Sequence, residues 1–146
     1  MKSVLISIQP RWCEKIASGE KTIEVRKTAP KEVPFKAYIY CTKEKKQDDI
    51  IWAGAFGDRG KWNGHIIGEF ICDKVEKFDV PYPAWDKGYL NDILKNSCLT
   101  YNDLHSYIGS GNRGYGWHIS DLKIYDKPLS LSELGVSYPP QSWRYI

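Results

Sequence analysis

The sequence contains no apolar run that approaches the roughly 18 residues of a membrane-spanning helix. Its opening stretch is short, is interrupted by Ser3 and Ser7, and is followed by Arg11 instead of a small-residue cleavage site, which argues against a signal peptide. We therefore expect a cytoplasmic protein without membrane contacts. The length of 146 residues, with 42% hydrophobic and 27% charged residues, is typical of ordinary globular proteins, and we assign residues 1–146 to a single domain.

Close pairs of metal-binding residues are also missing. The four cysteines lie at positions 13, 41, 72 and 98 without a Cys-x-x-Cys pair, and the three histidines show no metal-ligand spacing. Structural zinc sites are usually built from such pairs, whereas isolated cysteines in reducing compartments are usually buried thiols. We predict free cysteines, no metal ion and no cofactor.

The net charge is small, at +3 with a pI near 8.6. Dedicated nucleic-acid-binding proteins tend to be more basic, so this charge permits weak attraction to phosphate without requiring it. Aromatic residues are more informative, because they make up 14% of the chain and include six tryptophans and ten tyrosines. Flat aromatic side chains stack on nucleobases but also fill the cores of small β-proteins, and both interpretations stay open.

The spacing of apolar residues predicts an α+β fold. Strands are expected at residues 4–8, 22–26, 37–41, 65–72 and 116–125, and helices at residues 10–18, 90–94 and 100–108, the last with a capping pattern at its start. The fourth strand follows a turn at Asn63-Gly64 and an irregular stretch with glycines at 54, 57 and 60, and Pro81 and Pro83 break the chain later. About five or six strands with two or three inserted helices form a mixed sheet that can close into a barrel.

The glycine-rich segment Gly109-Ser110-Gly111-Asn112-Arg113-Gly114 matches the G-x-G-x-x-G pattern of dinucleotide-binding proteins. That motif requires a strand before it and a helix after it, so that the pyrophosphate meets a helix N-terminus. The expected order here is helix first and strand second, and we reject the motif as a cofactor site. A loop that presents Arg113 to a phosphate group stays open.

The histidines do not form a recognisable catalytic set with nearby nucleophiles and acids. His105 is expected on the surface of a helix. His118 lies beside Trp117 in a predicted strand and is the better candidate for a functional site.

The segment at residues 19–26 concentrates charge on one predicted strand. Alternation places residues 23 and 25 on its apolar side and Glu24 and Arg26 on the other side. Strict alternation puts Lys21 on the apolar side, and it joins the charged pair only if it belongs to the preceding turn or if the strand start twists. Three such charges suit an anionic or amide-rich ligand, and Lys21 acts as an acid, base or nucleophile if burial favours its neutral form. The alternative is an ordinary solvated Glu–Arg pair.

This segment resembles the ASCH signature G-x-K-x-x-E-x-R at all four of its named positions. Its sequence is Gly19-Glu20-Lys21-Thr22-Ile23-Glu24-Val25-Arg26. Other parts of the chain are similar to small bacterial and phage ASCH proteins in the same order: the opening strand, Gln9-Pro10 with the following helix, Gly68-Glu69-Phe70, Trp117-His118-Ile119-Ser120 and Pro140-Gln141-Ser142-Trp143. The resemblance to the ASCH family therefore spans nearly the whole chain.

The resemblance implies a PUA-like β-barrel with a cleft beside the motif and a role in RNA binding or RNA-linked regulation. Some ASCH proteins are amidohydrolases that act on acetylated cytidine, and others are described as ribonucleases. The amidohydrolase branch uses a lysine, a threonine and a glutamate, of which only the lysine matches here, as Lys21. Glu24 stands at the threonine position, and Asn96 and Ser97 stand near the glutamate position, which argues against that chemistry by the same route.

The leading hypothesis is a binding module for RNA or a nucleoside-like ligand. In a cleft that recognises a nucleotide or a flipped-out base, Lys21 and Arg26 would bind phosphate or carbonyl groups, and Glu24 would accept from amino groups. The other candidate ligand-binding residues are Arg113, His118, Ser120 and Gln141, together with Tyr40, Trp117 and Trp143 as stacking faces. One alternative is a ribonuclease or a hydrolase of modified nucleosides, with Lys21 and Glu24 as catalytic residues. A second alternative is a protein-interaction domain.

Overall fold

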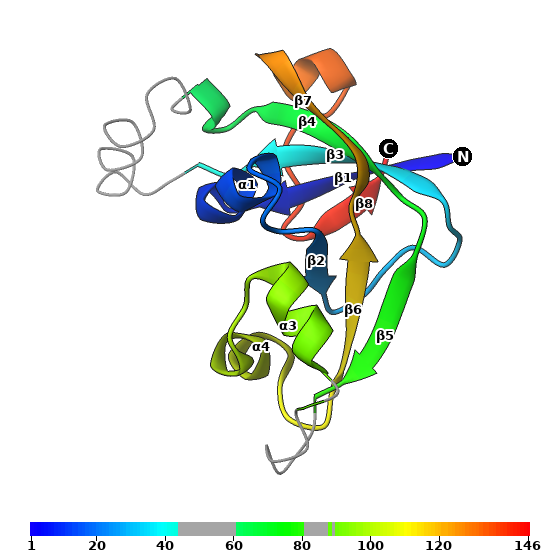
Figure 1. The fold of residues 1–146 in the computed structure, drawn as a ribbon. Helices are drawn as coiled ribbons and strands as arrows, with labels where there is room; N and C mark the ends of the chain where they lie inside the picture. Colours follow the sequence, from blue (N-terminus) through cyan, green and yellow to red (C-terminus); the bar gives the residue numbers. More distant parts are fainter. Residues whose placement is uncertain (44–60, 81–87, 89) are drawn as a thin grey trace.

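The computed structural model describes residues 1–43, 61–80, 88 and 90–146 (Figure 1). The strands of this part of the chain are β1 (Lys2–Ile8), β2 (Ile23–Arg26), β3 (Phe35–Cys41), β4 (Ile66–Cys72), β5 (Val75–Asp79), β6 (Arg113–His118), β7 (Ser120–Leu129) and β8 (Trp143–Tyr145). The helices are α1 (Pro10–Ala17), α3 (Asn91–Ser97) and α4 (Tyr101–Ile108), with a 3-10 helix at Ser132–Leu134. The glycine-rich stretch at 54–60 and the two prolines at 81 and 83 lie outside the described residues.

The described strands form two sheets. A five-stranded sheet has the order β7-β4-β3-β1-β8, and a three-stranded sheet has the order β2-β6-β5. β1 and β3 run parallel, whereas the other strand pairs in the described residues are antiparallel. The predicted α+β class with a mixed sheet is confirmed. Eight strands replace the expected five or six, and over the described residues they do not close into a barrel.

Two segments of the chain run from one sheet into the other. β4 lies in the five-stranded sheet and is followed by β5 in the three-stranded one, and β6 and β7 make the reverse passage (Figure 1). The prediction of one long bent strand at 116–125 is therefore wrong, because the strand breaks at Ile119. Asp121, near the start of β7, has a φ of 50°, a left-handed conformation that redirects the chain as it changes sheets.

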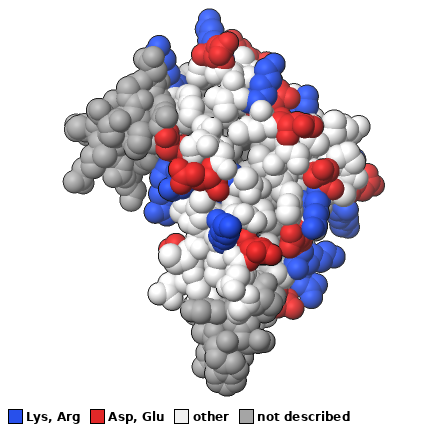
Figure 2. Space-filling view, in the orientation of Figure 1, with Lys and Arg blue, Asp and Glu red and all other residues white. Residues whose placement is uncertain are grey.

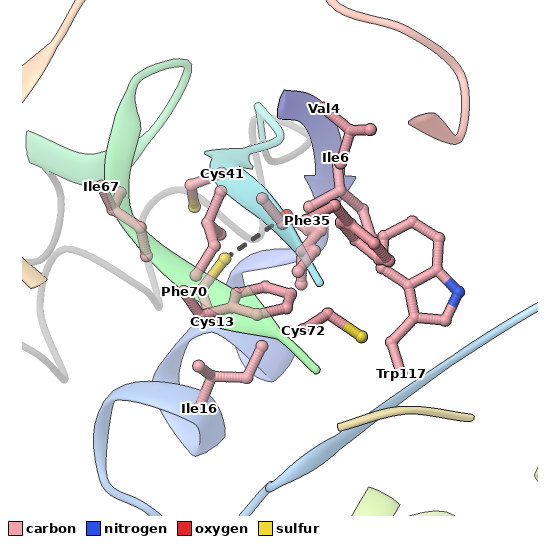
Figure 3. Packing of buried hydrophobic residues seen from close by; sticks show 13 residues of the cluster. Val4, Ile6, Cys13, Ile16, Phe35, Cys41, Ile67, Phe70, Cys72 and Trp117 are labelled. Atoms are coloured by element: carbon pink, nitrogen blue, oxygen red, sulfur yellow. Dashed lines mark hydrogen bonds between the residues drawn. The ribbon is translucent and has the colours of Figure 1, made fainter. Parts of the chain in front are cut away.

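Helix α1 covers the five-stranded sheet and is anchored in the largest core cluster. Cys13 and Ile16 point from α1 into this cluster, which also contains Phe35, Phe70 and Trp117 (Figure 3). Pro10 fits the first turn of the helix because its missing N–H has no partner there. The four cysteines are free and three are buried, as predicted. None of the described helices has the length and apolar character needed to cross a membrane.

Strand β2 is an edge strand of the three-stranded sheet, and helices α3 and α4 pack against it. Ile23 and Val25 pack with buried side chains of both helices in a second core cluster. The predicted alternation along this strand is confirmed, since its apolar side faces the helices. Glu24 and Arg26 alternate with these two residues and line a cleft between α1 and α4.

The turn predicted at Asn63-Gly64 is also confirmed. The N–H of His65 donates to the carbonyl of Trp62 at 2.9 Å. Gly64 has a φ of 74°, a conformation that glycine adopts at little cost. The turn leads the chain into β4.

Candidate functional site

A cleft of about 560 Å³ lies beside β2, within the roughly 300–1,000 Å³ that is usual for small-molecule sites. The described residues that line it come from the ends of β1 and β3, from α1, from β2 and the turn before it, from the α3–α4 connection and α4, and from the segment before β8. They are Ser7, Gln9, Arg11, Trp12, Lys21, Glu24, Val25, Arg26, Thr42, Leu99, Asp103, Ser106, Tyr107, Gln141 and Ser142.

Lys21 is almost completely buried at one end of the motif, with 2% of its surface exposed. Its Nζ donates to the carbonyl of Ser97 at 2.6 Å and lies 3.6 Å from Oε1 of Glu24. The residue precedes β2 and therefore belongs to the turn. Of the two ways in which Lys21 could join Glu24 and Arg26, a position in the turn is the one observed. Gly19, with a φ of 84°, makes that turn possible.

Glu24 occupies the centre of the motif and is also buried, with 6% of its surface exposed. Its Oε1 accepts from the backbone N–H of Val25 at 3.0 Å. Its Oε2 lies 3.5 Å from Nη2 of Arg26 but has no hydrogen-bond partner in the described part of the protein. Leaving a buried acceptor without a hydrogen bond costs about 1–3 kcal/mol. Because Oε2 is covered by its neighbours, a ligand that donates to it must first displace one of them, and it would then recover part of this free energy.

Arg26 connects three segments around the cleft. Its Nη2 donates to the carbonyl of Ser7 at 2.7 Å, and its Nη1 donates to the hydroxyl of Ser142 at 3.3 Å. Ser7 in turn donates to the carbonyl of Pro140 at 2.6 Å. Arg26 therefore fixes the C-terminal segment against β1 and β2. The sequence did not indicate this structural role.

Two aromatic residues that the sequence did not single out as ligand contacts line the cleft. Trp12, on α1, has the guanidinium of Arg11 at 4.5 Å and Nζ of Lys21 at 5.0 Å from its ring centre. Tyr107, on α4, keeps 41% of its surface exposed, and burial of its hydroxyl raises its pKa. In the sequence both residues fall at helical spacing with apolar neighbours, which is also the signature of core residues.

The three predicted stacking residues lie elsewhere. Trp117 is fully buried, and its indole N–H donates to the carbonyl of Thr28 at 3.2 Å. Trp143 packs edge to face on Trp117 and donates to the hydroxyl of Thr28 at 2.9 Å. Tyr40 is 3% exposed and belongs to a separate core cluster. None of the three lines the cleft.

Three other candidates are placed on the three-stranded sheet or next to it, outside the cleft lining. Arg113 forms an exposed ion pair with Asp79 at 3.2 Å, and His118 pairs with Glu76. The hydroxyl of Ser120 lies 3.4 Å from a carboxylate oxygen of Asp73. The structure thus brings together Lys21, Glu24, Arg26 and Gln141 from the predicted set and separates the others from them.

A capping box holds the helix that forms the outer wall of the cleft. The hydroxyl of Thr100 accepts from the N–H of Asp103 at 3.1 Å, and the carboxylate of Asp103 accepts from the N–H of Thr100 at 3.0 Å. These bonds, together with the charge of Arg11, lower the pKa of Asp103. The capping pattern predicted from residues 100–103 is confirmed, and it fixes the start of α4.

Comparison with solved structures gives full-length matches, although no protein-family model and no curated protein matches the sequence significantly. The ASCH structure from Zymomonas mobilis is 19% identical, with a TM-score of 0.72 over 99% of this chain and 87% of that one. A point mutant of the same protein is 18% identical, with a TM-score of 0.71 over 100% and 91% of the two chains.

A more distant similarity links the chain to the N-terminal domain of McrB from Staphylothermus marinus. The identity is 13% and the TM-score is 0.51, over 90% of this chain and 78% of that one. Identities this low establish the fold and leave the ligand open. The chain has the α+β fold of the ASCH structures.

Proposed function

We propose that this ASCH-type protein binds RNA or a nucleoside-like ligand by receiving a nucleobase in the cleft beside the G-x-K-x-x-E-x-R motif. The observation that carries the proposal is the buried carboxylate of Glu24, a residue of the cleft lining whose Oε2 has no hydrogen-bond partner among the described residues. The amino and ring N–H groups of nucleobases are donors of the kind that this oxygen requires.

The surroundings of Glu24 suit a flat ligand with polar edges. Trp12 and Tyr107 line the cleft on α1 and α4, and aromatic side chains are the usual stacking partners of unpaired bases. Gln141 and Ser142 add side chains that donate and accept hydrogen bonds. A base combines the two features that this cleft requires. Its flat apolar face can pack on Tyr107, and its N–H groups can donate to Glu24.

The floor of the cleft is less suited to an anion. Lys21 and Arg26 approach the two oxygens of Glu24 at 3.6 and 3.5 Å, so one carboxylate is shared between both cations. The atom that still needs a partner is an acceptor, and a phosphate oxygen beside it would be repelled. We therefore place the base, and not a phosphate, against Glu24. This revises the expectation that Lys21 and Arg26 bind phosphate directly.

A second candidate function, hydrolysis of RNA or of a modified nucleoside, rests on the close approach of Lys21 and Glu24 within the cleft. Binding is the better-supported function, because Lys21 donates to Ser97 and one oxygen of Glu24 accepts from the backbone. Both groups thus hold the local structure. Analysis of bound RNA for cleavage products, with and without divalent metal, separates the two functions, and products that vanish with Glu24→Gln would favour hydrolysis.

Replacement of Tyr107 with Ala tests the cleft as a base-binding site. Stacking on an aromatic side chain contributes about 1–3 kcal/mol per base, so the Kd for RNA is expected to rise by about fivefold to a hundredfold. The half-exposed position of Tyr107 should leave the fold intact. The measurement is fluorescence anisotropy with a labelled single-stranded RNA, together with calorimetry on the four nucleosides.

The matched control is Tyr138→Ala, because Tyr138 is 70% exposed and lies outside the cleft lining. This variant should bind RNA like the unmodified protein. Equal affinities for the Tyr107 and Tyr138 variants would remove the cleft from the proposal.

A further inference from the structure

We infer that the cleft takes one nucleotide from within a single-stranded nucleic acid, with Arg11 and Lys27 binding the backbone phosphates on either side of the inserted base. This inference rests on the proposed function and selects a strand over a free nucleoside as the ligand. It follows from a difference between two pairs of cations. Lys21 and Arg26 are ion-paired with Glu24 inside the cleft, whereas Arg11 and Lys27 are exposed and stand over aromatic rings.

Arg11 and Lys27 are both exposed and both stand over an aromatic ring of the cleft lining. The guanidinium of Arg11 lies 4.5 Å from the ring centre of Trp12, and Nζ of Lys27 lies 5.2 Å from that of Tyr107. Such cation–π contacts hold a cation in place without neutralising its charge. Among the described residues neither cation has an ion-pair partner within 4.0 Å, although the charge of Arg11 acts on Asp103 across the cleft.

Arg11 belongs to the cleft lining, whereas Lys27 lies outside the lining and contacts it through Tyr107. Arg11 lies at the start of α1, and Lys27 follows β2 directly and contacts Tyr107 on α4. In Figure 1 α1 lies above β2 and α4 lies below it, both toward the left of the view. A base that enters between α1 and α4 therefore has one cation on each side of its point of entry. Two phosphates that flank one nucleotide match this arrangement, whereas a free nucleoside has no phosphate for either cation.

The charges deeper in the cleft are arranged differently. Lys21 and Arg26 share the carboxylate of Glu24, and Lys21 is fully buried. Asp103, the acidic side chain of the lining on α4, is engaged by the backbone of Thr100. Negative charge is therefore best accommodated at the mouth, and an N–H group is best accommodated at the floor. A nucleotide must enter with its base first.

The described residues on the face shown in Figure 2 form no broad basic area that would bind a strand by itself. Figure 2 shows Lys and Arg side chains interspersed with Asp and Glu over the visible face. The net charge of the chain is only +3. Few phosphates should then be contacted, and affinity should depend weakly on salt. For two contacts on a single strand, the slope of log K against log salt is expected to be about −1.4.

The test compares a labelled single-stranded RNA pentamer with the corresponding nucleosides over a range of salt concentrations. The pentamer is expected to bind more tightly than any nucleoside. Arg11→Gln and Lys27→Gln should each weaken pentamer binding roughly threefold and reduce the slope by about 0.7, and they should weaken nucleoside binding by a smaller factor without any change in its salt dependence. A DNA pentamer that behaves in the same way also supports the inference, because the contacts proposed are to phosphate.

Lys123→Gln is the matched control, since Lys123 is exposed and stands 6.0 Å from the ring centre of Tyr125 on β7, away from the cleft. It should change neither affinity nor slope. If nucleosides bind in the cleft as tightly as the pentamer, or if the Arg11 and Lys27 variants match Lys123→Gln, this inference is wrong and the proposed function stands. If neither nucleoside nor pentamer binding responds to Tyr107→Ala, the proposed function itself fails.

Discussion

Replacement of Lys21 with Met is expected to lower the free energy of unfolding by about 3 kcal/mol or more. The substitution removes the donor to the carbonyl of Ser97 and one of the two cations that approach Glu24. Glu24 then stays buried with only Arg26 beside it. Breaking one side of a buried ion pair costs more than the pair contributes, because the remaining charge keeps its desolvation penalty. Chemical denaturation followed by circular dichroism measures the change.

Lys15→Met provides the matched comparison on the same stretch of chain. Lys15 pairs with Glu20 at 3.1 Å, but both side chains are largely exposed, and exposed pairs contribute little. The Lys15 variant should therefore unfold close to the unmodified protein. A double variant, Lys21→Met with Glu24→Gln, should lose less stability than the sum of its parts, because the two residues interact. Equal stabilities for Lys21→Met and Lys15→Met would show that the buried pair does not hold the motif in place.

The structural role of Lys21 affects how its variants are interpreted. A loss of RNA binding in Lys21→Met follows either from a missing ligand contact or from a disturbed cleft. Tyr107 and Glu24 are better probes of recognition, because Tyr107 is half-exposed and Oε2 of Glu24 has no hydrogen-bond partner among the described residues.

Replacement of Glu24 with Gln is expected to weaken RNA binding by about tenfold to a hundredfold. The proposal gives the carboxylate oxygen Oε2 a hydrogen bond from the base, and bonds to charged groups contribute about 1.5–3 kcal/mol. The side-chain amide of Gln can place either its NH₂ group or its oxygen where Oε2 of Glu24 stood. The first is a donor, and the second is a neutral and therefore weaker acceptor. Anisotropy titration with the same labelled RNA gives the affinity, and a thermal melt of the same sample shows that the variant is folded.

Glu20→Gln is the control for this substitution, because Glu20 lies in the same motif but is exposed and outside the cleft lining. It removes an equal charge and should leave RNA affinity unchanged. A second variant, Glu24→Asp, keeps the charge but withdraws the carboxylate by one methylene, and it should also bind RNA less well. A folded Glu24→Gln protein with unaltered affinity would contradict the role given to Oε2.

Patterns in the sequence predicted those features of the site that depend only on residues close together along the chain. The alternation along residues 23–26 is a consequence of strand geometry, and it placed Glu24 and Arg26 together without tertiary information. The capping box at Thr100 is equally local. The position of Lys21 was left open by alternation, because only the fold decides where the turn ends and β2 begins.

The aromatic wall of the cleft could not be predicted in this way. Trp117 lies in a strand, and a strand pattern does not show that its ring is buried in contact with Phe35 and Trp143. Trp12 and Tyr107 lie on helices as neighbours of core residues, and only the packing of α1 and α4 around β2 shows that they reach the cleft. The passage of β6 into β7 across two sheets likewise depends on partners far along the chain.

The most direct measurement is a crystal structure of the protein with a single-stranded RNA pentamer. We expect one base in the cleft against Tyr107, with an amino or ring nitrogen within about 3.2 Å of Oε2 of Glu24 and with phosphates next to Arg11 and Lys27. RNA bound on another surface with the cleft empty, or a phosphate in contact with Glu24, would contradict the proposed recognition of a base.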